Sequence, residues 1–284
     1  MKMKPKLLAL AGSILFSVNG FSQDTNFWVF LCFGQSNMEG FPGIPPQDKG
    51  PVDGRFRVLA AVDFPTQQRE QGNWYPAVPP LCRPSAGLCP ADYFGRTMVS
   101  NLPPAFKVGI VNVAIGGCKI ELFEKGSFRT YAATAPNWMT NIISAYGGNP
   151  YQRLVDMAKV AQKDGVIKGI LLHQGESNPN DKQWPDKVKG IYDNLLMDLN
   201  LKAEEVPLLA GELVNADQNG ACAGMNQIID DLPQTIPTAH VVSSKGCPGR
   251  PDHLHFTPEG YRELGARYAG EMLSLLGRPQ TESP

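Results

Sequence analysis

The chain has 284 residues, of which 42% are hydrophobic and 19% charged, so we expect a globular core and exclude a largely disordered protein. The formal net charge is −1, and no basic patch lies beyond the first residues, which argues against nucleic acid as a partner.

The N-terminus has the pattern of a secretory signal peptide. Three lysines accompany the apolar stretch 7–18, which is too short to span a bilayer, and the small residues Gly20 and Ser22 permit cleavage after Ser22. The alternative is a membrane anchor or a buried first helix. We expect a signal peptide at 1–22, a single domain at 23–284, a secreted or periplasmic location, and no membrane association after cleavage.

Five continuous apolar runs predict strands of a parallel sheet, because strands that are covered on both faces lose the alternation of apolar and polar residues. The runs are 27–33, 107–115, 167–173, 206–213 and 239–244.

Helical patterns separate these runs. One begins after Asn149, a second at Pro185 and the last after Thr257, and their apolar residues recur three or four positions apart. The alternation predicts a three-layer α/β/α sandwich around a mostly parallel, five-stranded sheet. The segments 41–90 and 116–148 are long and poorly periodic, and we expect binding loops there.

The six cysteines can form disulfide bonds if the chain is exported. No C-x-x-C pair indicates a metal centre. The sequence alone does not choose the connectivity, and the plausible pairs are Cys82–Cys89, Cys222–Cys247 and Cys32–Cys118.

Four short motifs contain residue types that acyl transfer uses, and three of them directly follow predicted strands. Because parallel strands end at the same edge of a sheet, we expect those three to converge. The motifs are G-Q-S-N-M at 34–38, I-G-G at 115–117, H-Q-G-E-S-N at 173–178 and D-H-L-H-F-T-P at 252–258.

A serine becomes a nucleophile when a base removes its proton, and the base needs an orienting carboxylate. Ser36 ends the first predicted strand, and Asp252 stands three positions before His255 at the start of the last helix. The backbone N–H of Gly117, the Gln174 amide and the serine's own N–H are candidate donors to an oxyanion. Taken alone, each residue also fits an ordinary turn or capping role.

In this order, the four motifs resemble those of SGNH (GDSL-like) hydrolases, and most closely the carbohydrate-esterase branch that holds acetylxylan esterases and sialate O-acetylesterase-like domains. Met38 replaces the second glycine of a G-x-S-x-G elbow, which argues against the α/β-hydrolase fold. The resemblance implies Ser36 as nucleophile, His255 as base and Asp252 as its orienting acid.

The resemblance also implies an oxyanion hole and a supporting layer. We expect Glu176 to hold the nucleophile loop by hydrogen bonds. Cys118 departs from the branch, which often has Ser or Thr at this position. The expected oxyanion donors are Ser36, Gly117 and Gln174, and the expected supporting residues are Gln35, Asn37 and Glu176.

We therefore predict a secreted serine esterase that removes O-acetyl groups from carbohydrate, above all acetylated xylan or its oligosaccharides, through an acyl-enzyme intermediate and without a metal or other cofactor. Sialate O-acetylesterase and feruloyl esterase activities are alternatives on the same scaffold. The oligomeric state stays open.

Two other classes of function explain fewer residues. A metallohydrolase built on His173, Glu176, Asp252, His253 and His255 leaves Ser36 without a role. A non-catalytic carbohydrate-binding module has no need of a histidine base. Aromatic residues in loop-like stretches are candidates for stacking on sugar rings, with core packing as the alternative: Trp74, Tyr75, Trp138 and Trp184.

Overall fold

The computed structural model describes residues 23–41 and 43–278. The predicted signal peptide at 1–22 lies outside the described residues. Within them, no helix combines the length and the apolar character needed to cross a membrane.

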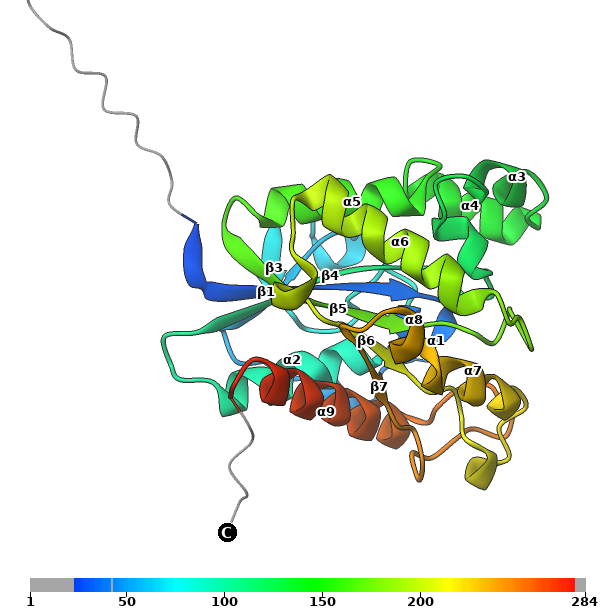
Figure 1. Ribbon diagram of the computed structural model, residues 1–284. Coiled ribbons are helices and arrows are strands. Elements are labelled where there is room, and N and C mark those ends of the chain that lie inside the picture. Colours follow the sequence, from blue (N-terminus) through cyan, green and yellow to red (C-terminus); the bar gives the residue numbers. More distant parts are fainter. Residues whose placement is uncertain (1–22, 42, 279–284) are drawn as a thin grey trace, which may run out of the picture.

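A seven-stranded sheet forms the middle layer of the molecule (Figure 1). Its strand order is β3-β2-β4-β1-β5-β6-β7, and every neighbouring pair is parallel except β2 and β3. The strands are β1 (Asp24–Gly34), β2 (Phe56–Leu59), β3 (Trp74–Pro76), β4 (Lys107–Ala114), β5 (Gly165–His173), β6 (Leu208–Gly211) and β7 (Ala239–Val242).

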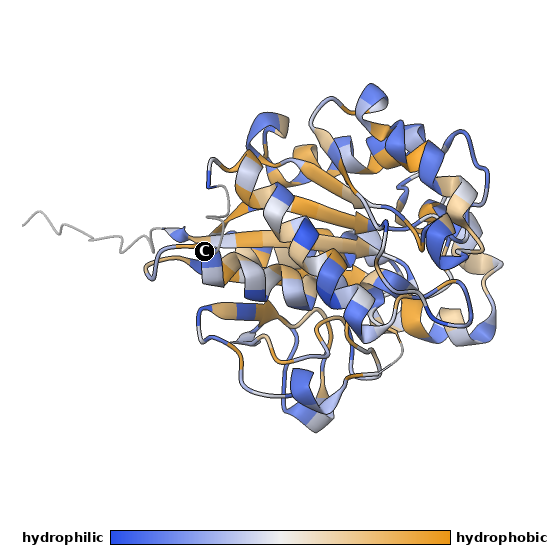
Figure 2. Cartoon of the chain, turned by 90° about the horizontal axis from the view of Figure 1, so that it is seen from below, coloured by the Kyte–Doolittle hydropathy of each residue, from blue (hydrophilic) through white to orange (hydrophobic). Residues whose placement is uncertain are grey.

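Helices cover both faces of the sheet. In Figure 1, α5 and α6 lie on one face, whereas α2 and α9 pack side by side on the other. Figure 2 shows strands that are predominantly hydrophobic between helices with hydrophilic outer sides. The helices are α1 (Ser36–Glu39), α2 (Pro90–Asn101), α3 (Phe128–Ala133), α4 (Asn137–Ala145), α5 (Pro150–Ala161), α6 (Trp184–Leu199), α7 (Asn226–Asp230), α8 (Leu232–Thr235) and α9 (Pro258–Leu275).

The predicted α/β/α class is confirmed, and all five predicted strands are present. The predicted strand number is wrong, because β2 and β3 extend the sheet from within the segment 41–90. The segment 116–148 likewise contains two helices, α3 and α4. The short strands β2 and β3 carry no long apolar run, so their sequences lack the signal that identifies the five others.

Caps that the sequence predicts fix the ends of two helices. The Asn149 side chain accepts a hydrogen bond from the Gln152 N–H at the start of α5. The Thr257 hydroxyl does the same for the Gly260 N–H at the start of α9. Further along α9, the buried Tyr268 hydroxyl donates to the Leu172 carbonyl of β5 at 2.6 Å. This bond holds the last helix against the centre of the sheet.

The central strands end in register. Gly34 of β1 pairs with Ala114 of β4 on one side and with His173 of β5 on the other. Gly34 has a φ of 149°, and a Cβ there would overlap the His173 carbonyl oxygen, so only glycine fits this close approach. The predicted convergence of the three motifs that follow these strands is confirmed.

The cysteines correct a further prediction. All six are free thiols, so none of the three predicted disulfides forms. The Cys118 thiol instead contacts the Gly34 carbonyl, and the Cys82 thiol contacts the Ala114 carbonyl. Burial raises the pKa of the Cys32 and Cys89 thiols, which disfavours the thiolate needed for disulfide exchange.

Candidate active site

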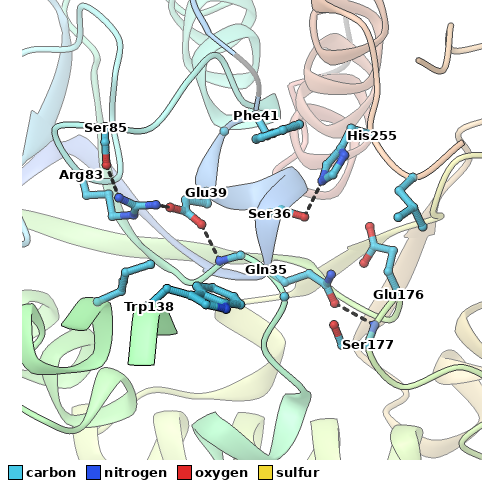
Figure 3. Close-up of a pocket in the computed structure, with 15 residues that line it drawn as sticks. Gln35, Ser36, Glu39, Phe41, Arg83, Ser85, Trp138, Glu176, Ser177 and His255 are labelled. Atoms are coloured by element: carbon cyan, nitrogen blue, oxygen red, sulfur yellow. Dashed lines mark hydrogen bonds and ion pairs between the residues drawn. The ribbon is translucent and has the colours of Figure 1, made fainter. Parts of the chain in front are cut away.

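A cavity of about 560 Å³ lies at the carboxyl edge of the central strands (Figure 3). Its walls come from the turn after β1, the turns after β4 and β5, the helix α4 and the segment before α9. The lining includes Ser36, Gly117, Trp138, Glu176 and His255. Residues from all four sequence motifs therefore meet in one place.

Ser36 enters this cavity because β1 stops at Gly34 and a single helical turn, α1, begins at the serine. The preceding residue, Gln35, is buried and extended, and its backbone N–H donates to the His173 carbonyl. Its side-chain oxygen accepts from the Ser177 N–H at 3.1 Å. The residue before Ser36 is thus tied to the end of β5 by its backbone and to the turn after β5 by its side chain.

A chain of hydrogen bonds links Ser36, His255 and Asp252. Nδ1 of His255 lies 2.9 Å from the Asp252 carboxylate, and Nε2 lies 2.9 Å from the Ser36 hydroxyl. Because an ionised carboxylate only accepts, Nδ1 carries the ring proton and Nε2 is free to accept from the serine. The three residues are in the arrangement that activates a serine.

Asp252 is kept ionised by a tight turn. Its burial opposes ionisation, but hydrogen bonds from the backbone N–H groups of His255 and Leu254, followed by the His255 ring, outweigh this effect and lower the pKa of Asp252 to about 2. These bonds also fix the direction of the carboxylate. Because Asp252 and His255 are only three positions apart, the Asp252 carboxylate can bind both the local backbone and the His255 ring.

Two residues that line the cavity, Ser36 and Gly117, have backbone N–H groups without a partner among the described residues. Gly117 has a φ of 70°, which suits glycine, and the Trp138 indole packs over the position of its missing Cβ. The neighbouring Gly116 N–H is not available, since it donates to the Glu39 carboxylate.

Gln174 does not join these donors. It is buried beneath the cavity and is not part of its lining. Its amide nitrogen lies 2.7 Å from the Asn178 side-chain oxygen, and its oxygen accepts from the Trp184 indole at 2.5 Å. The predicted oxyanion role of Gln174 is therefore not supported by the geometry, which gives its amide a bracing position between β5 and α6.

Asn37 connects the serine turn to the histidine segment. Its amide nitrogen donates to the Leu254 carbonyl at 3.0 Å and to Glu176 at 2.6 Å. Its oxygen accepts from the buried Tyr261 hydroxyl at 2.7 Å and from the Phe256 N–H at 3.4 Å. One side chain thus holds the backbone on both sides of His255.

Glu176 and His173 lie below the reacting groups in a buried environment. Burial raises the pKa of Glu176 to about 7, although hydrogen bonds from its own backbone and from Asn37 oppose the rise. Burial lowers the pKa of His173 to about 4. One Glu176 oxygen and the His173 Nδ1 have no hydrogen-bond partner among the described residues. Burial therefore disfavours the charged form of both side chains.

The cavity contains residues that sequence reasoning missed. Glu39 forms an ion pair with Arg83, although burial raises the pKa of this carboxyl group. Phe41 packs on the His255 ring, with 4.2 Å between the ring centroids. Glu39 directly follows the G-Q-S-N-M motif, whereas Arg83 and Phe41 belong to no motif that identifies them.

The four aromatic residues that the sequence offers for sugar stacking differ in where they lie relative to the cavity. Trp138 lines the cavity and is 54% exposed, so it is available to a ligand. Trp184 is fully buried, and Trp74 and Tyr75 belong to β3, away from this cavity. Core or sheet packing is therefore the correct reading for three of the four.

The five residues considered as metal ligands from the sequence do not form a metal site in the described part of the chain. Across residues 23–41 and 43–278, no group of three or more histidine, cysteine, aspartate or glutamate side chains is placed to hold a metal ion. His255 instead uses both ring nitrogens for Asp252 and Ser36.

A mostly parallel sheet that presents a serine after its central strand, with an Asp-x-x-His turn before the closing helix, is the arrangement of the SGNH hydrolase fold. The chain belongs to the SASA family, described as carbohydrate esterase, sialic acid-specific acetylesterase, whose model matches residues 26–274. It is therefore a carbohydrate esterase, with general O-acetyl esterase activity.

Relatives of known structure have the same fold. The probable carbohydrate esterase At4g34215 of Arabidopsis thaliana is 23% identical to this chain, and the match covers 87% of this chain and 90% of the relative. Its solved structure has a TM-score of 0.67 and is 98% covered. The structure of NanS has a TM-score of 0.66 at 16% identity, with 90% of this chain and 99% of NanS covered. XAC1771, a carbohydrate acetylesterase from Xanthomonas citri, has a TM-score of 0.59 at 18% identity, with 87% and 56% covered.

Proposed function

We propose that this carbohydrate esterase is a secreted serine hydrolase that removes O-acetyl groups from acetylated xylan or its oligosaccharides. The observation that carries the serine mechanism is the continuous hydrogen-bonded chain from Ser36 through His255 to Asp252, with 2.9 Å at each of its two links. The single-turn helix behind Ser36 and the Asx-type turn at Asp252 preorganise both ends of this chain.

The reaction proceeds in two steps. Nε2 of His255 takes the hydroxyl proton of Ser36 as the serine oxygen attacks the acetyl carbonyl carbon. The bond between this carbon and the sugar oxygen then breaks, and the proton passes from His255 to the departing sugar. Water then gives a proton to the same ring as its oxygen attacks the acetyl-serine carbonyl carbon. The bond between this carbon and the serine oxygen breaks, acetate leaves, and His255 returns the proton to Ser36.

Negative charge develops on the carbonyl oxygen in both steps. The unpartnered N–H groups of Ser36 and Gly117 are the donors that stabilise it. Removing one such donor in other enzymes costs roughly 10²- to 10³-fold in kcat. Asp252 stabilises the imidazolium that forms, because it stays ionised next to Nδ1.

Replacement of the nucleophile tests the mechanism. Ser36→Ala should reduce the release of acetate from acetylated xylan by at least about 10⁴-fold, because the remaining site has no group to carry the acetyl. A fluorophosphonate probe should label the wild type and not the variant, and circular dichroism should be the same for both. Labelling of Ser36→Ala would exclude this serine as the nucleophile.

The sugar and the acyl group are compared in the same assay. The description of the family favours O-acetylated sialic acid as a second candidate substrate. Acetate release from acetylated xylan, acetate release from O-acetylated sialic acid, and ferulate release from a feruloylated oligosaccharide are measured at equal enzyme concentration. Faster hydrolysis of either of the last two would replace xylan in this proposal.

The proposed secretion depends on the first residues of the sequence. The basic and apolar pattern at 1–22 supports export, and cleavage after Ser22 leaves Gln23 as the new N-terminus. N-terminal sequencing of the protein recovered from outside the cytoplasm measures this. An intact N-terminus on the recovered protein would contradict it.

A further inference from the structure

A second cavity adjoins the one that contains Ser36. Its volume is about 460 Å³, and three residues, Arg83, Ser85 and Ile142, line both cavities. Both volumes lie in the range of roughly 300–1,000 Å³ that is usual for small-molecule sites. Figure 3 shows Arg83 and Ser85 at the opposite end of the first cavity from His255. The two cavities therefore adjoin at these residues, and together we call them the groove, which leads away from the serine.

The second cavity contains polar side chains suited to hydroxyl groups. Asp63, Gln71 and Asn141 line it, and all three are exposed. One Asp63 oxygen accepts from the Gln71 backbone N–H at 2.8 Å. Within the described residues, the side-chain amides of Gln71 and Asn141 form no hydrogen bond, so both can donate to and accept from a ligand.

The junction between the cavities is electrically balanced. The Arg83 guanidinium pairs with the Glu39 carboxylate and donates to the Ser85 hydroxyl. Its charge is therefore already compensated within the protein, and an anionic ligand gains little there. Ile142 adds an apolar surface at the same place, and the C–H face of a sugar ring packs well on such a surface.

We propose that the second cavity is a subsite for a neutral sugar unit adjacent to the acetylated sugar that lies over Ser36. This inference rests on the proposed esterase function and makes the substrate a glycan chain rather than a free monosaccharide. A third cavity shares Asp63 and Gln71 with the second and continues the groove. A glycan longer than two sugar units can therefore extend into this third cavity.

The experiment compares substrates of different length on variants of the subsite. Singly acetylated xylose and acetylated xylotriose are given to the wild type and to the double variant Gln71→Ala/Asn141→Ala. The ratio of kcat/KM for the trimer to kcat/KM for the monomer is measured, because this ratio cancels a general effect on the chemistry. Gln227→Ala, an exposed amide on α7 and outside the groove, is the matched control.

In the wild type we expect a ratio of about 10, which corresponds to about 1.4 kcal/mol of additional binding in the transition state. The double variant should lower the ratio to near 2, and Gln227→Ala should keep the wild-type value. Equal kcat/KM for the two substrates in the wild type, or an unchanged ratio in the double variant, would overturn the subsite. Hydrolysis of neither substrate by the wild type would overturn the proposed action on xylan, on which the subsite rests. Turnover of 4-nitrophenyl acetate by Ser36→Ala would instead overturn the proposed serine mechanism, so the two failures are distinguishable.

Discussion

The reacting residues and the layer beneath them have opposite electrostatic environments. Asp252 is 38% exposed at its side chain and its pKa falls to about 2, because backbone N–H groups and the His255 ring outweigh its partial burial. The Glu176 side chain is only 6% exposed, and its burial raises its pKa to about 7. The exposed Asp252 thus supplies the negative charge that the reaction needs. The buried Glu176 helps to position the reacting residues, and burial disfavours its charged form. Substitutions in the first region should lower the rate, and substitutions in the second should lower both rate and stability.

The largest expected effect lies in the exposed region. His255→Ala should reduce kcat/KM by at least about 10³-fold, because no other ring reaches the Ser36 hydroxyl. His253 is the natural control, since it is two positions away and adopts a φ of 59° that asparagine tolerates. His253→Asn should change kcat/KM by less than about 2-fold, and the reverse order of the two variants would move the base.

The next largest effect is expected for Asn37, a buried residue that positions the segment around His255. Asn37→Ala removes the bonds to Leu254 and Phe256 and leaves the Tyr261 hydroxyl unpaired. We expect a loss of about 2–3 kcal/mol in the free energy of unfolding, as buried groups lose partners, and a fall of roughly 10²-fold in kcat/KM, because misplacement of a catalytic group is costly.

Asn226 provides a matched control for this variant. It is also a buried asparagine, and it binds both the N–H and the carbonyl of Leu213, outside the 254–256 segment. Asn226→Ala should lower stability by a similar amount and kcat/KM by less than about 3-fold. Equal losses of activity in the two variants would mean that Asn37 acts only through general stability.

The smallest expected effect is a change in how stability depends on pH. Glu176 has a folded pKa of about 7, above its ordinary value of 4.5. Between these values the folded state holds a proton that the unfolded state releases, so stability falls as the pH rises. Across this window the loss should reach about 3 kcal/mol at 1.36 kcal/mol per pKa unit.

Glu176→Gln removes this titration. Urea unfolding at pH ~5 and pH ~8 should give a smaller decrease in the variant than in the wild type by up to about 3 kcal/mol. His173 has its pKa lowered by burial and is present in both proteins, so it cancels in the comparison. The same pH dependence in both proteins would show that Glu176 is ionised equally in the folded and unfolded states.

The sequence predicted the positions of the motifs better than their orientations. Long apolar runs identify β1, β4 and β5, and parallel strands necessarily end at one edge, so the meeting of Ser36 with the glycines was predictable. The short strands β2 and β3 depend on pairing with β4 and carry too little local signal.

The direction of a side chain depends on neighbours that one sequence does not reveal. Gln174 turns away from the cavity because Asn178 and Trp184 offer it partners. The ion pair between Glu39 and Arg83 joins segments that are distant in the sequence, so neither residue predicts the other as its partner. The disulfide prediction failed for the same reason, since spacing in the chain does not reveal which thiols are brought together.

The close packing at Gly34 has a consequence for attempts to redesign this esterase. A side chain at this position would drive the tips of β1 and β5 apart and so displace the nucleophile turn and the H-Q-G-E turn together. This junction is therefore a poor target for diversification. New selectivity should be sought by varying the side chains of Ser85 and Trp138, which line the cavity but belong to neither of these two turns.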